Sequence, residues 1–241
     1  MVREYKKTKF EDDLKETYTV EIPIIYVIGL SNAINSIKKV IKFRDVMEQN
    51  ECKIAILSDN PTIQKENDGY YLEMLTNEVV AMKYRIVLMN HFVKSLEVKE
   101  TYDLIIIAIT GGIISYSRQL IDDFGVTVYC AMKAVRADYV ILNIFYGKYT
   151  KELWGKLEKQ IEYILGERVD AYNMVNCILE IEKSESKKEF CMLEISQEMV
   201  QKKLKEIGQK KIYSLEELSE YERLAHDVIN KLEEYAEIQE V

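Results

Sequence analysis

The sequence is poor in the side chains that bind transition metals. It contains two histidines, His91 and His226, and four scattered cysteines that form no CxxC pair. A zinc site needs a full set of such ligands at short spacing, so the sequence predicts no metal site. The cysteine triplet with which a radical enzyme holds an iron-sulfur cluster is missing as well. We expect Cys52, Cys130, Cys177 and Cys191 to be reduced thiols.

Long apolar runs and clusters of basic residues are also missing. No segment approaches the roughly 18 apolar residues of a membrane span, and the amino end has no signal-peptide core. The net charge of -8 argues against binding to nucleic acid or anionic lipid, because both require clustered Lys and Arg. We therefore expect a cytoplasmic protein without nucleic-acid or membrane partners, whose charge is compatible with a basic peptide.

Apolar runs alternate with helical patterns along most of the chain. The hydrophobic content of 48% over 241 residues is enough for a sizeable core. Buried strands are predicted at 22–28, 52–59, 102–112, 126–135 and 137–147, and amphipathic helices at 35–47 and 150–166. This order predicts an α/β fold with a doubly wound, mostly parallel sheet and right-handed crossovers.

The carboxyl-terminal part has a different pattern. The runs "NCILEIE" and "FCMLEIS" flank the polar stretch "KSESKKE", which predicts a hairpin on the sheet edge. Two helices follow, at 197–208 and from about 215 to 235, with Ser214 and Glu217 as a predicted capping box for the second. We expect a flexible or helical extension at 1–21, an α/β domain at 22–185, and an edge strand plus helical segment at 186–241.

The first predicted strand runs into a turn that resembles a phosphate loop. Aligning the pattern GxxxxGK[ST] on Gly29 places Ile34 at the second glycine, Asn35 at the lysine and Ser36 at the hydroxyl. Two of the four defining positions are kept. Ile34 resists the positive φ that such loops use, and Asn35 removes the positive charge.

The run "DLIIIAITGG" resembles in shape the Walker B strand of the P-loop family that includes MinD. Ala108 stands where that family has a metal-associated aspartate. The lysine and this aspartate are therefore lost together, and with them the charge clamp on the phosphates and the magnesium anchor. We predict a degenerate P-loop NTPase-like scaffold that does not hydrolyse nucleotide, and we assign it no catalytic residue, cofactor or metal.

A ligand site is expected where the carboxyl ends of the parallel strands meet. The predicted ligand-binding residues on this rim are Gly29, Ser31, Asn32, Asn35, Ser36, Asp59, Thr110, Gly111 and Gly112. Simpler roles remain open for some of them. One alternative is that Gly111 and Gly112 allow the chain to turn and bind no ligand. Similarly, Asp59 can be a turn residue before Asn60 and Pro61.

Three segments together resemble one family. With "IYVIGLSNAIN", "YDLIIIAITGGII" and "MNHFVKS", the chain resembles clostridial peptide maturation system proteins over roughly residues 22–185. Such proteins accompany radical S-adenosylmethionine enzymes in gene clusters for ribosomally made, post-translationally modified peptides. The resemblance implies an accessory role, with precursor peptide or the radical S-adenosylmethionine maturase as partner, but no reaction or catalytic residues.

Two other functions remain open from the sequence. In a nucleotide-dependent P-loop enzyme with a divergent site, Ser36 and Asp59 would hold magnesium, and Lys38 or a partner subunit would supply the missing charge. Alternatively, a regulatory domain would bind a small molecule in the same crevice. The sequence does not decide whether the chain forms a homo-oligomer.

Overall fold

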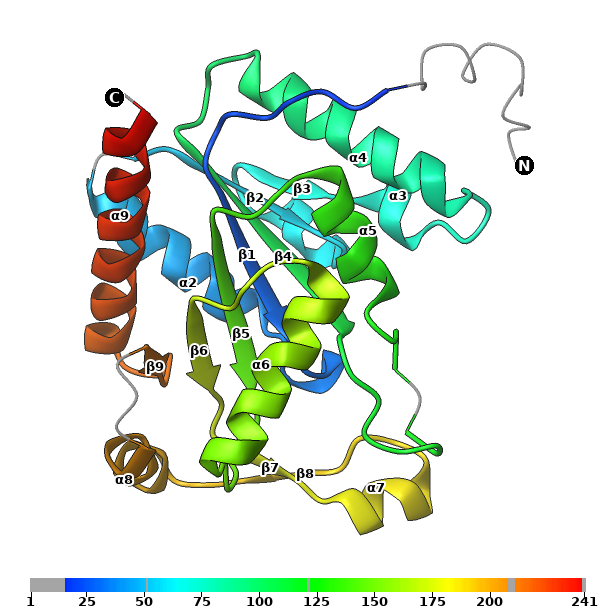
Figure 1. Cartoon of the computed structure of the whole chain (residues 1–241), viewed down its shortest axis with the longest axis vertical. Coiled ribbons are helices and arrows are strands. Elements are labelled where there is room, and N and C mark those ends of the chain that lie inside the picture. Colours follow the sequence, from blue (N-terminus) through cyan, green and yellow to red (C-terminus); the bar gives the residue numbers. More distant parts are fainter. Residues whose placement is uncertain (1–15, 51, 121, 208–210, 240–241) are drawn as a thin grey trace.

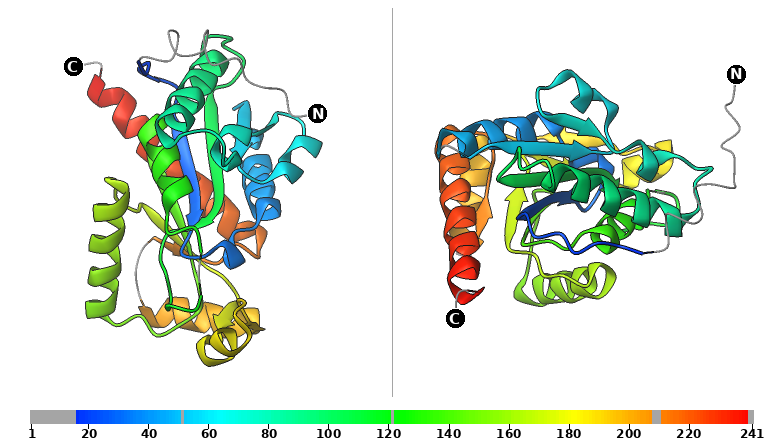
Figure 2. Two further views of the ribbon diagram at one scale, coloured as in Figure 1. Left: turned by 90° about the vertical axis from the view of Figure 1, so that its right-hand side faces the viewer. Right: turned by 90° about the horizontal axis from the view of Figure 1, so that it is seen from above.

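The protein is built around one large parallel sheet. The computed structural model describes residues 16–50, 52–120, 122–207 and 211–239. Within them, seven strands form a sheet of order β3-β2-β4-β1-β5-β6-β9, and every neighbouring pair is parallel. Helices cover both faces of this sheet (Figure 1, Figure 2). The predicted doubly wound, mostly parallel α/β fold is confirmed.

The central strands are buried along nearly their whole length. The strands of the sheet are β1 (Ile24–Gly29), β2 (Ile54–Ser58), β3 (Gly69–Tyr71), β4 (Leu104–Gly112), β5 (Tyr139–Ile144), β6 (Ala171–Met174) and β9 (Ile212–Tyr213). All residues of β1, β2 and β5 are buried. Layers on both faces therefore explain why these strands read as continuous apolar runs.

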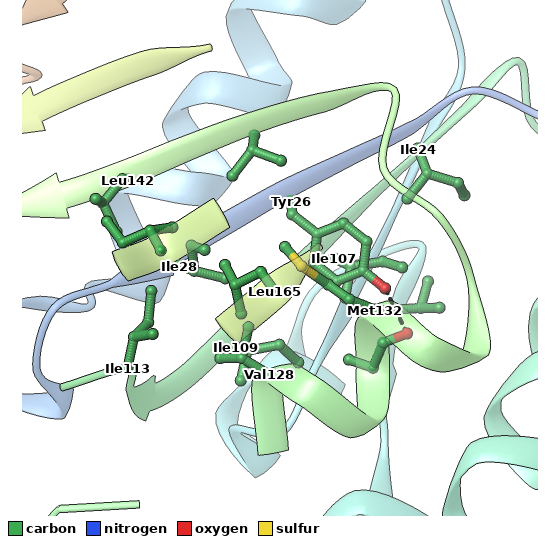
Figure 3. Packing of buried hydrophobic residues seen from close by; sticks show 14 of the residues in the cluster. Ile24, Tyr26, Ile28, Ile107, Ile109, Ile113, Val128, Met132, Leu142 and Leu165 are labelled. Carbon is green, nitrogen blue, oxygen red and sulfur yellow. Dashed lines mark hydrogen bonds between the residues drawn. The ribbon is translucent and has the colours of Figure 1, made fainter. Parts of the chain in front are cut away.

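One face of the sheet is covered by α4 (Met82–Glu97), α5 (Val126–Ala134) and α6 (Lys151–Leu165), with the short α3 (Glu73–Thr76) beside them. Figure 3 shows the packing on this face, where aliphatic side chains of β1, β4 and β5 meet those of α5 and α6. The fully buried Tyr26 donates its hydroxyl hydrogen bond to the carbonyl oxygens of Ala131 and Val135, at 2.8 and 3.0 Å. This polar contact fixes the carboxyl end of α5 against β1.

The opposite face is covered by α2 (Ile37–Met47) and α9 (Leu218–Gln239), which lie side by side. Phe43 and Met47 of α2 and Leu224 and Val228 of α9 are at most 1% exposed. The helical spacing of these apolar positions matches the predicted helices. Residues at the carboxyl end of the chain thus complete the second layer of the sheet.

One of the predicted strands is wrong. Residues 126–135, predicted as a strand, form α5. Short apolar runs rich in β-branched residues fit a buried strand and a buried helix equally well. The choice is made by topology, because a crossover between parallel strands needs an element on the face of the sheet.

The predicted hairpin forms, but as a separate sheet. β7 (Cys177–Leu179) and β8 (Met192–Glu194) pair in antiparallel fashion, and α7 (Ile181–Lys187) occupies the connection that was predicted as a polar turn. We call β7 and β8 the ribbon. With α7 and α8 (Gln197–Ile207) it lies beyond the carboxyl ends of β5 and β6 (Figure 1). The predicted boundary at 185/186 falls inside α7.

The capping box predicted for the last helix is not formed. The helix begins at Leu218, and Ser214 is fully buried four residues earlier. The Ser214 backbone N–H donates to Glu220, and its hydroxyl exchanges hydrogen bonds with the Gln197 side chain. Ser214 therefore joins α9 to α8 instead of capping a helix.

The described part of the amino-terminal extension lies along α4. Asn90 accepts a hydrogen bond from the Tyr18 backbone N–H at 2.7 Å and donates to the Tyr18 carbonyl at 2.9 Å. His91 contacts the Glu16 carbonyl at 2.9 Å. Both side chains lie within a helix and hold the incoming chain. Across the described ranges, no helix combines the length and apolar character needed to cross a membrane.

Candidate functional site

The two glycine-containing turns predicted from the sequence meet at the rim of the sheet. β1 and β4 are adjacent, and Gly29 is paired in register with Gly112. Past the strands, the N–H groups of Ile113 and Ile114 donate to the carbonyls of Gly29 and Leu30, at 3.2 and 3.4 Å. The turn after β1 and the turn after β4 are therefore joined directly.

The turn after β1 directs its backbone donors inward to the protein. Its residues Asn32–Ile34 form a short 3-10 helix, and no described residue between Gly29 and Ser36 has a positive φ. The N–H groups of Leu30, Asn32, Ala33, Ile34 and Asn35 all have partners within the chain. A phosphate loop needs such donors to converge on an anion, so this turn does not have the form of a phosphate cradle.

Asn35, at the position of the missing lysine, lies across Gly29. Its amide nitrogen donates to the carbonyls of Ile109 and Thr110, at 3.2 and 3.1 Å. A Cβ on Gly29 would lie 2.1 Å from the Asn35 amide oxygen, closer than atoms can approach. Gly29 is therefore needed here for close packing of the Asn35 side chain and not for an unusual backbone angle.

Asn35 begins a chain of three amide side chains along the rim. Asn143, at the end of β5, donates to the Asn35 amide oxygen at 2.9 Å, and Asn173 of β6 donates to the Asn143 amide oxygen at 2.7 Å. The Asn173 oxygen accepts from the Leu215 backbone N–H at 3.0 Å. We call Asn35, Asn143 and Asn173 the amide chain. It links the phosphate-loop position to the segment before α9.

The direction of the amide chain is fixed at both ends. At one end two backbone carbonyls require a donor from Asn35, and at the other the Leu215 N–H requires an acceptor from Asn173. Turning any one amide by 180° would therefore set like groups against each other. Asn143 and Asn173 are only 6% and 1% exposed, so an unmade hydrogen bond here would be costly.

Carboxylates of the chain itself accept hydrogen bonds from backbone donors of both turns. Asp122 accepts from the N–H groups of Asn32 and Gly112, at 3.0 and 3.2 Å. Asp59 accepts from the Thr110 backbone N–H at 2.8 Å and from its hydroxyl at 3.0 Å. Internal carboxylates thus hold backbone donors next to the place where a phosphate loop would bind its anion.

Two of the rim carboxyls are partly desolvated. Burial raises the pKa of Asp59, although the hydrogen bonds from Thr110 act in the opposite direction. Burial also raises the pKa of Asp123, which accepts a hydrogen bond from the Thr127 N–H at 2.8 Å. Each of these two carboxyls faces backbone donors. No set of three or more His, Cys, Asp or Glu side chains in the described ranges is arranged to hold a metal ion.

A small cavity lies between α2 and the sheet, next to Ile34. Its volume is about 10 Å³, which is about enough for one water molecule. Its polar lining comes from Ser36, Lys39, Asn143 and Asn173. Lys39 forms an ion pair with Glu216, and Lys38 is exposed. Neither lysine donates a hydrogen bond to the turn after β1.

A larger hollow lies elsewhere, between α6 and α8. Its volume is about 770 Å³, and it is open to solvent. It is lined by Tyr149, Lys151, Trp154, Gly155, Glu158, Lys203, Glu206 and Ile207. None of the nine predicted ligand-binding residues contributes to it.

The predicted rim residues are brought together, and most of them bond to other groups of the chain itself. Ser31 accepts from the Ala33 N–H at 3.2 Å, and the side chain of Ser36 makes no capping hydrogen bond to α2. Ala108 pairs in register with Val27 in the middle of the sheet, and its carbonyl accepts from the Ser58 hydroxyl at 2.7 Å. The arrangement is a closed polar network on the rim.

Three residues of this network were not predicted: Asn143, Asn173 and Asp122. The first two are amides near the carboxyl ends of strands in otherwise apolar runs, and this position was a usable signal. For Asp122 the sequence offers only an acidic pair with Asp123. Its role depends on contacts with Asn32 and Gly112 that only the tertiary structure creates.

Gly112 provides a test of how tightly the two turns are packed. A Cβ there would lie 2.2 Å from an Asp122 carboxylate oxygen and 2.8 Å from the Ser31 Cα. Because a backbone atom cannot move aside easily, we expect Gly112→Ala to destabilise the protein by about 2 kcal/mol. Urea-induced unfolding measures this change.

Gly155 supplies the matched control for the Gly112 substitution. It lies within α6, and a Cβ there would meet nothing within 4 Å. Gly155→Ala is expected to stabilise the protein by roughly 0.5–1 kcal/mol, because alanine favours the helix. Equal effects of the two substitutions would contradict the close packing of the turns.

The comparisons with known proteins concern the fold. No protein-family model and no curated protein matches the sequence. Among solved structures, a DUF1611 family protein from Anabaena variabilis is similar, with TM-score 0.55 and 12% identity over 90% of this chain. A putative plasmid partition protein from Borrelia burgdorferi, bound to AMPPNP, has TM-score 0.53 and 12% identity, covering 90% of this chain and 100% of its own.

These likenesses show a shared fold and nothing further. A second structure of a Borrelia burgdorferi plasmid partition protein gives TM-score 0.50 with 14% identity, covering 88% of this chain and 100% of its own. The chain spans 62% of the length of the Anabaena protein. At such low identity the fold is shared, while the residues at the phosphate-loop position differ from the pattern GxxxxGK[ST].

Proposed function

We propose that this protein is an accessory protein in the maturation of a ribosomally synthesised, post-translationally modified peptide. In this role it binds the precursor peptide or the radical S-adenosylmethionine maturase, and it hydrolyses no nucleotide. The family resemblance in "IYVIGLSNAIN" and "YDLIIIAITGGII" supports the biological role. The P-loop fold serves here as a binding scaffold.

The observation that carries the proposal is the hydrogen bonding of the turn after β1. Five of its backbone N–H groups donate to oxygens of the chain itself, and Asn35 is held by the amide chain. Opening this turn for a nucleotide would break these bonds without supplying a lysine in return. Positioned positive charge provides most of the catalysis in phosphoryl transfer, so the closed turn supports a role in binding.

Calorimetric titration with magnesium and ATP, and separately with magnesium and GTP, tests the proposal. We expect no heat of binding and no rise in melting temperature. Binding with a dissociation constant of about 1 μM or tighter would overturn it. The control is Ser36→Ala, because the Ser36 hydroxyl stands where a phosphate loop binds magnesium. Nucleotide binding that is lost in this variant would establish the divergent P-loop enzyme instead.

A further inference from the structure

The ribbon has an unpaired edge that is suited to bind a peptide. We propose that an extended peptide segment with alternating apolar and basic side chains adds to β8 as a third strand. This inference rests on the proposed function, because it assigns a place on the molecule to the precursor peptide. Addition of a strand to an exposed edge is a common mode of peptide recognition, in which main-chain hydrogen bonds supply affinity.

The register of the ribbon determines which backbone groups are free. Ile195 donates its N–H to the Asn176 carbonyl at 2.9 Å, and Glu180 donates to the Cys191 carbonyl at 3.0 Å. Hydrogen-bonded pairs alternate along antiparallel strands, so the pair Ile178 and Leu193 between them is also hydrogen-bonded. The N–H and C=O groups of Met192 and Glu194 consequently point away from β7.

These outward groups are accessible. All three residues of β8 are exposed, and among the described strands only β7 pairs with it. An edge of this kind offers donors and acceptors for another strand. A partner strand paired with Met192 and Glu194 would leave the bonds between Leu193 and β7 intact.

Two of the three residues of β8 are apolar and exposed. Met192 is 42% exposed and Leu193 is 53% exposed. Exposed methionines adapt to varied apolar partners. A strand added to the free edge of β8 would lie beside these two side chains.

The charge around the ribbon favours a basic partner. Residues 176–199 contain six glutamates and three lysines, and two of these lysines, Lys183 and Lys187, already form ion pairs with Glu180 and Glu189. A basic peptide would therefore find complementary charge. A second copy of the chain would instead bring acidic strands together, over only the three residues of β8.

The ribbon is fixed to the end of the sheet where α/β proteins bind ligands. The Tyr146 N–H, two residues after β5, donates to the Cys177 carbonyl at 2.9 Å. Tyr116 places its ring against Phe145 and Phe190, with centroid distances of 5.6 and 6.3 Å. A peptide on β8 would thus lie on a fixed support at the carboxyl end of the sheet (Figure 1).

Fluorescence anisotropy with a fluorescein-labelled peptide of alternating lysine and valine tests the site. We expect the wild-type protein to bind it, and to bind the matched glutamate-valine peptide more weakly. Met192→Pro removes one outward N–H and keeps the bonds of Leu193, because proline is tolerated on an edge strand. We expect it to weaken binding about tenfold, and Met192→Ala to weaken it less.

Glu194→Lys is the second variant, and it changes charge without touching the backbone. We expect it also to weaken binding of the lysine-valine peptide. If Met192→Pro fails to fold, Glu194→Lys tests the β8 site by itself. Unchanged affinity in both variants would overturn the β8 site, while peptide binding itself would still support the proposed function. Failure of the wild-type protein to bind the peptide would overturn the β8 site as well.

The oligomeric state of the protein tests whether a second copy of the chain, and not a peptide, pairs with β8. Light scattering on the wild-type protein and on Met192→Pro would reveal pairing of β8 with a second copy. A wild-type dimer that becomes a monomer in this variant, without a change in peptide affinity, would overturn the peptide assignment. Nucleotide binding in the calorimetric titration would count against the proposed function and not against the strand edge.

Discussion

Replacing Asn143 with aspartate is expected to destabilise the protein by about 3 kcal/mol near neutral pH. The aspartate can accept the hydrogen bond from Asn173, but its second oxygen would face the Asn35 amide oxygen, and neither can donate. Asn35 cannot turn to help, because its nitrogen is held by two backbone carbonyls. Thermal unfolding should show a melting temperature about 10 °C lower.

The same substitution has a predicted pH dependence. Burial and the opposing oxygen of Asn35 would raise the pKa of the new carboxyl above its value in the unfolded chain. The stability of Asn143→Asp should therefore recover as the pH falls through that raised pKa, because the protonated form can donate to Asn35. Stability would be lost again as the pH rises.

Two variants serve as comparisons for this prediction. Asn143→Ala leaves the Asn35 oxygen and an Asn173 donor without partners, so it should be destabilising at every pH. Asn60→Asp carries the same change of charge, but the Asn60 side chain oxygen only accepts hydrogen bonds, from Thr62. It should have little effect. Equal stability of Asn143→Asp and Asn60→Asp across the pH range would disprove the ordered amide chain.

Restoring the missing lysine with Asn35→Lys is expected to cost about 3 kcal/mol and to confer no nucleotide binding. The substitution removes the acceptor for Asn143 and places a longer, charged side chain where Asn35 lies directly over Gly29. The backbone donors of the turn would still be engaged with Asp122 and with neighbouring carbonyls. Urea-induced unfolding and nucleotide titration measure the two outcomes.

Asn32→Lys is the matched control for this substitution. It adds the same charge three residues earlier, at an exposed position. We expect its stability to lie within about 0.5 kcal/mol of the wild-type value. Nucleotide binding gained by Asn35→Lys without loss of stability would show that the lysine alone was missing, and would contradict the closed turn.

Much of the fold follows from local pattern. Apolar runs such as 102–112 predicted buried strands, and the helical spacing in α2 and α6 predicted their helices, because one face of a helix must be apolar to pack on a sheet. The apolar pattern gave the wrong prediction where a buried strand and a buried helix would both satisfy it. Residues 126–135 are the example, because they form the helix α5. The pattern also missed β3, β6 and β9, which have two to four residues each.

The sequence by itself determined that the lysine and the aspartate of a P-loop are absent, since Asn35 and Ala108 stand in their places. Only the tertiary structure decided what fills the vacated site. Asn143 and Asp122 reach the turn from about a hundred residues away along the chain. Strand order makes these groups neighbours, and buried hydrogen bonds must be completed by whichever groups the fold brings within reach.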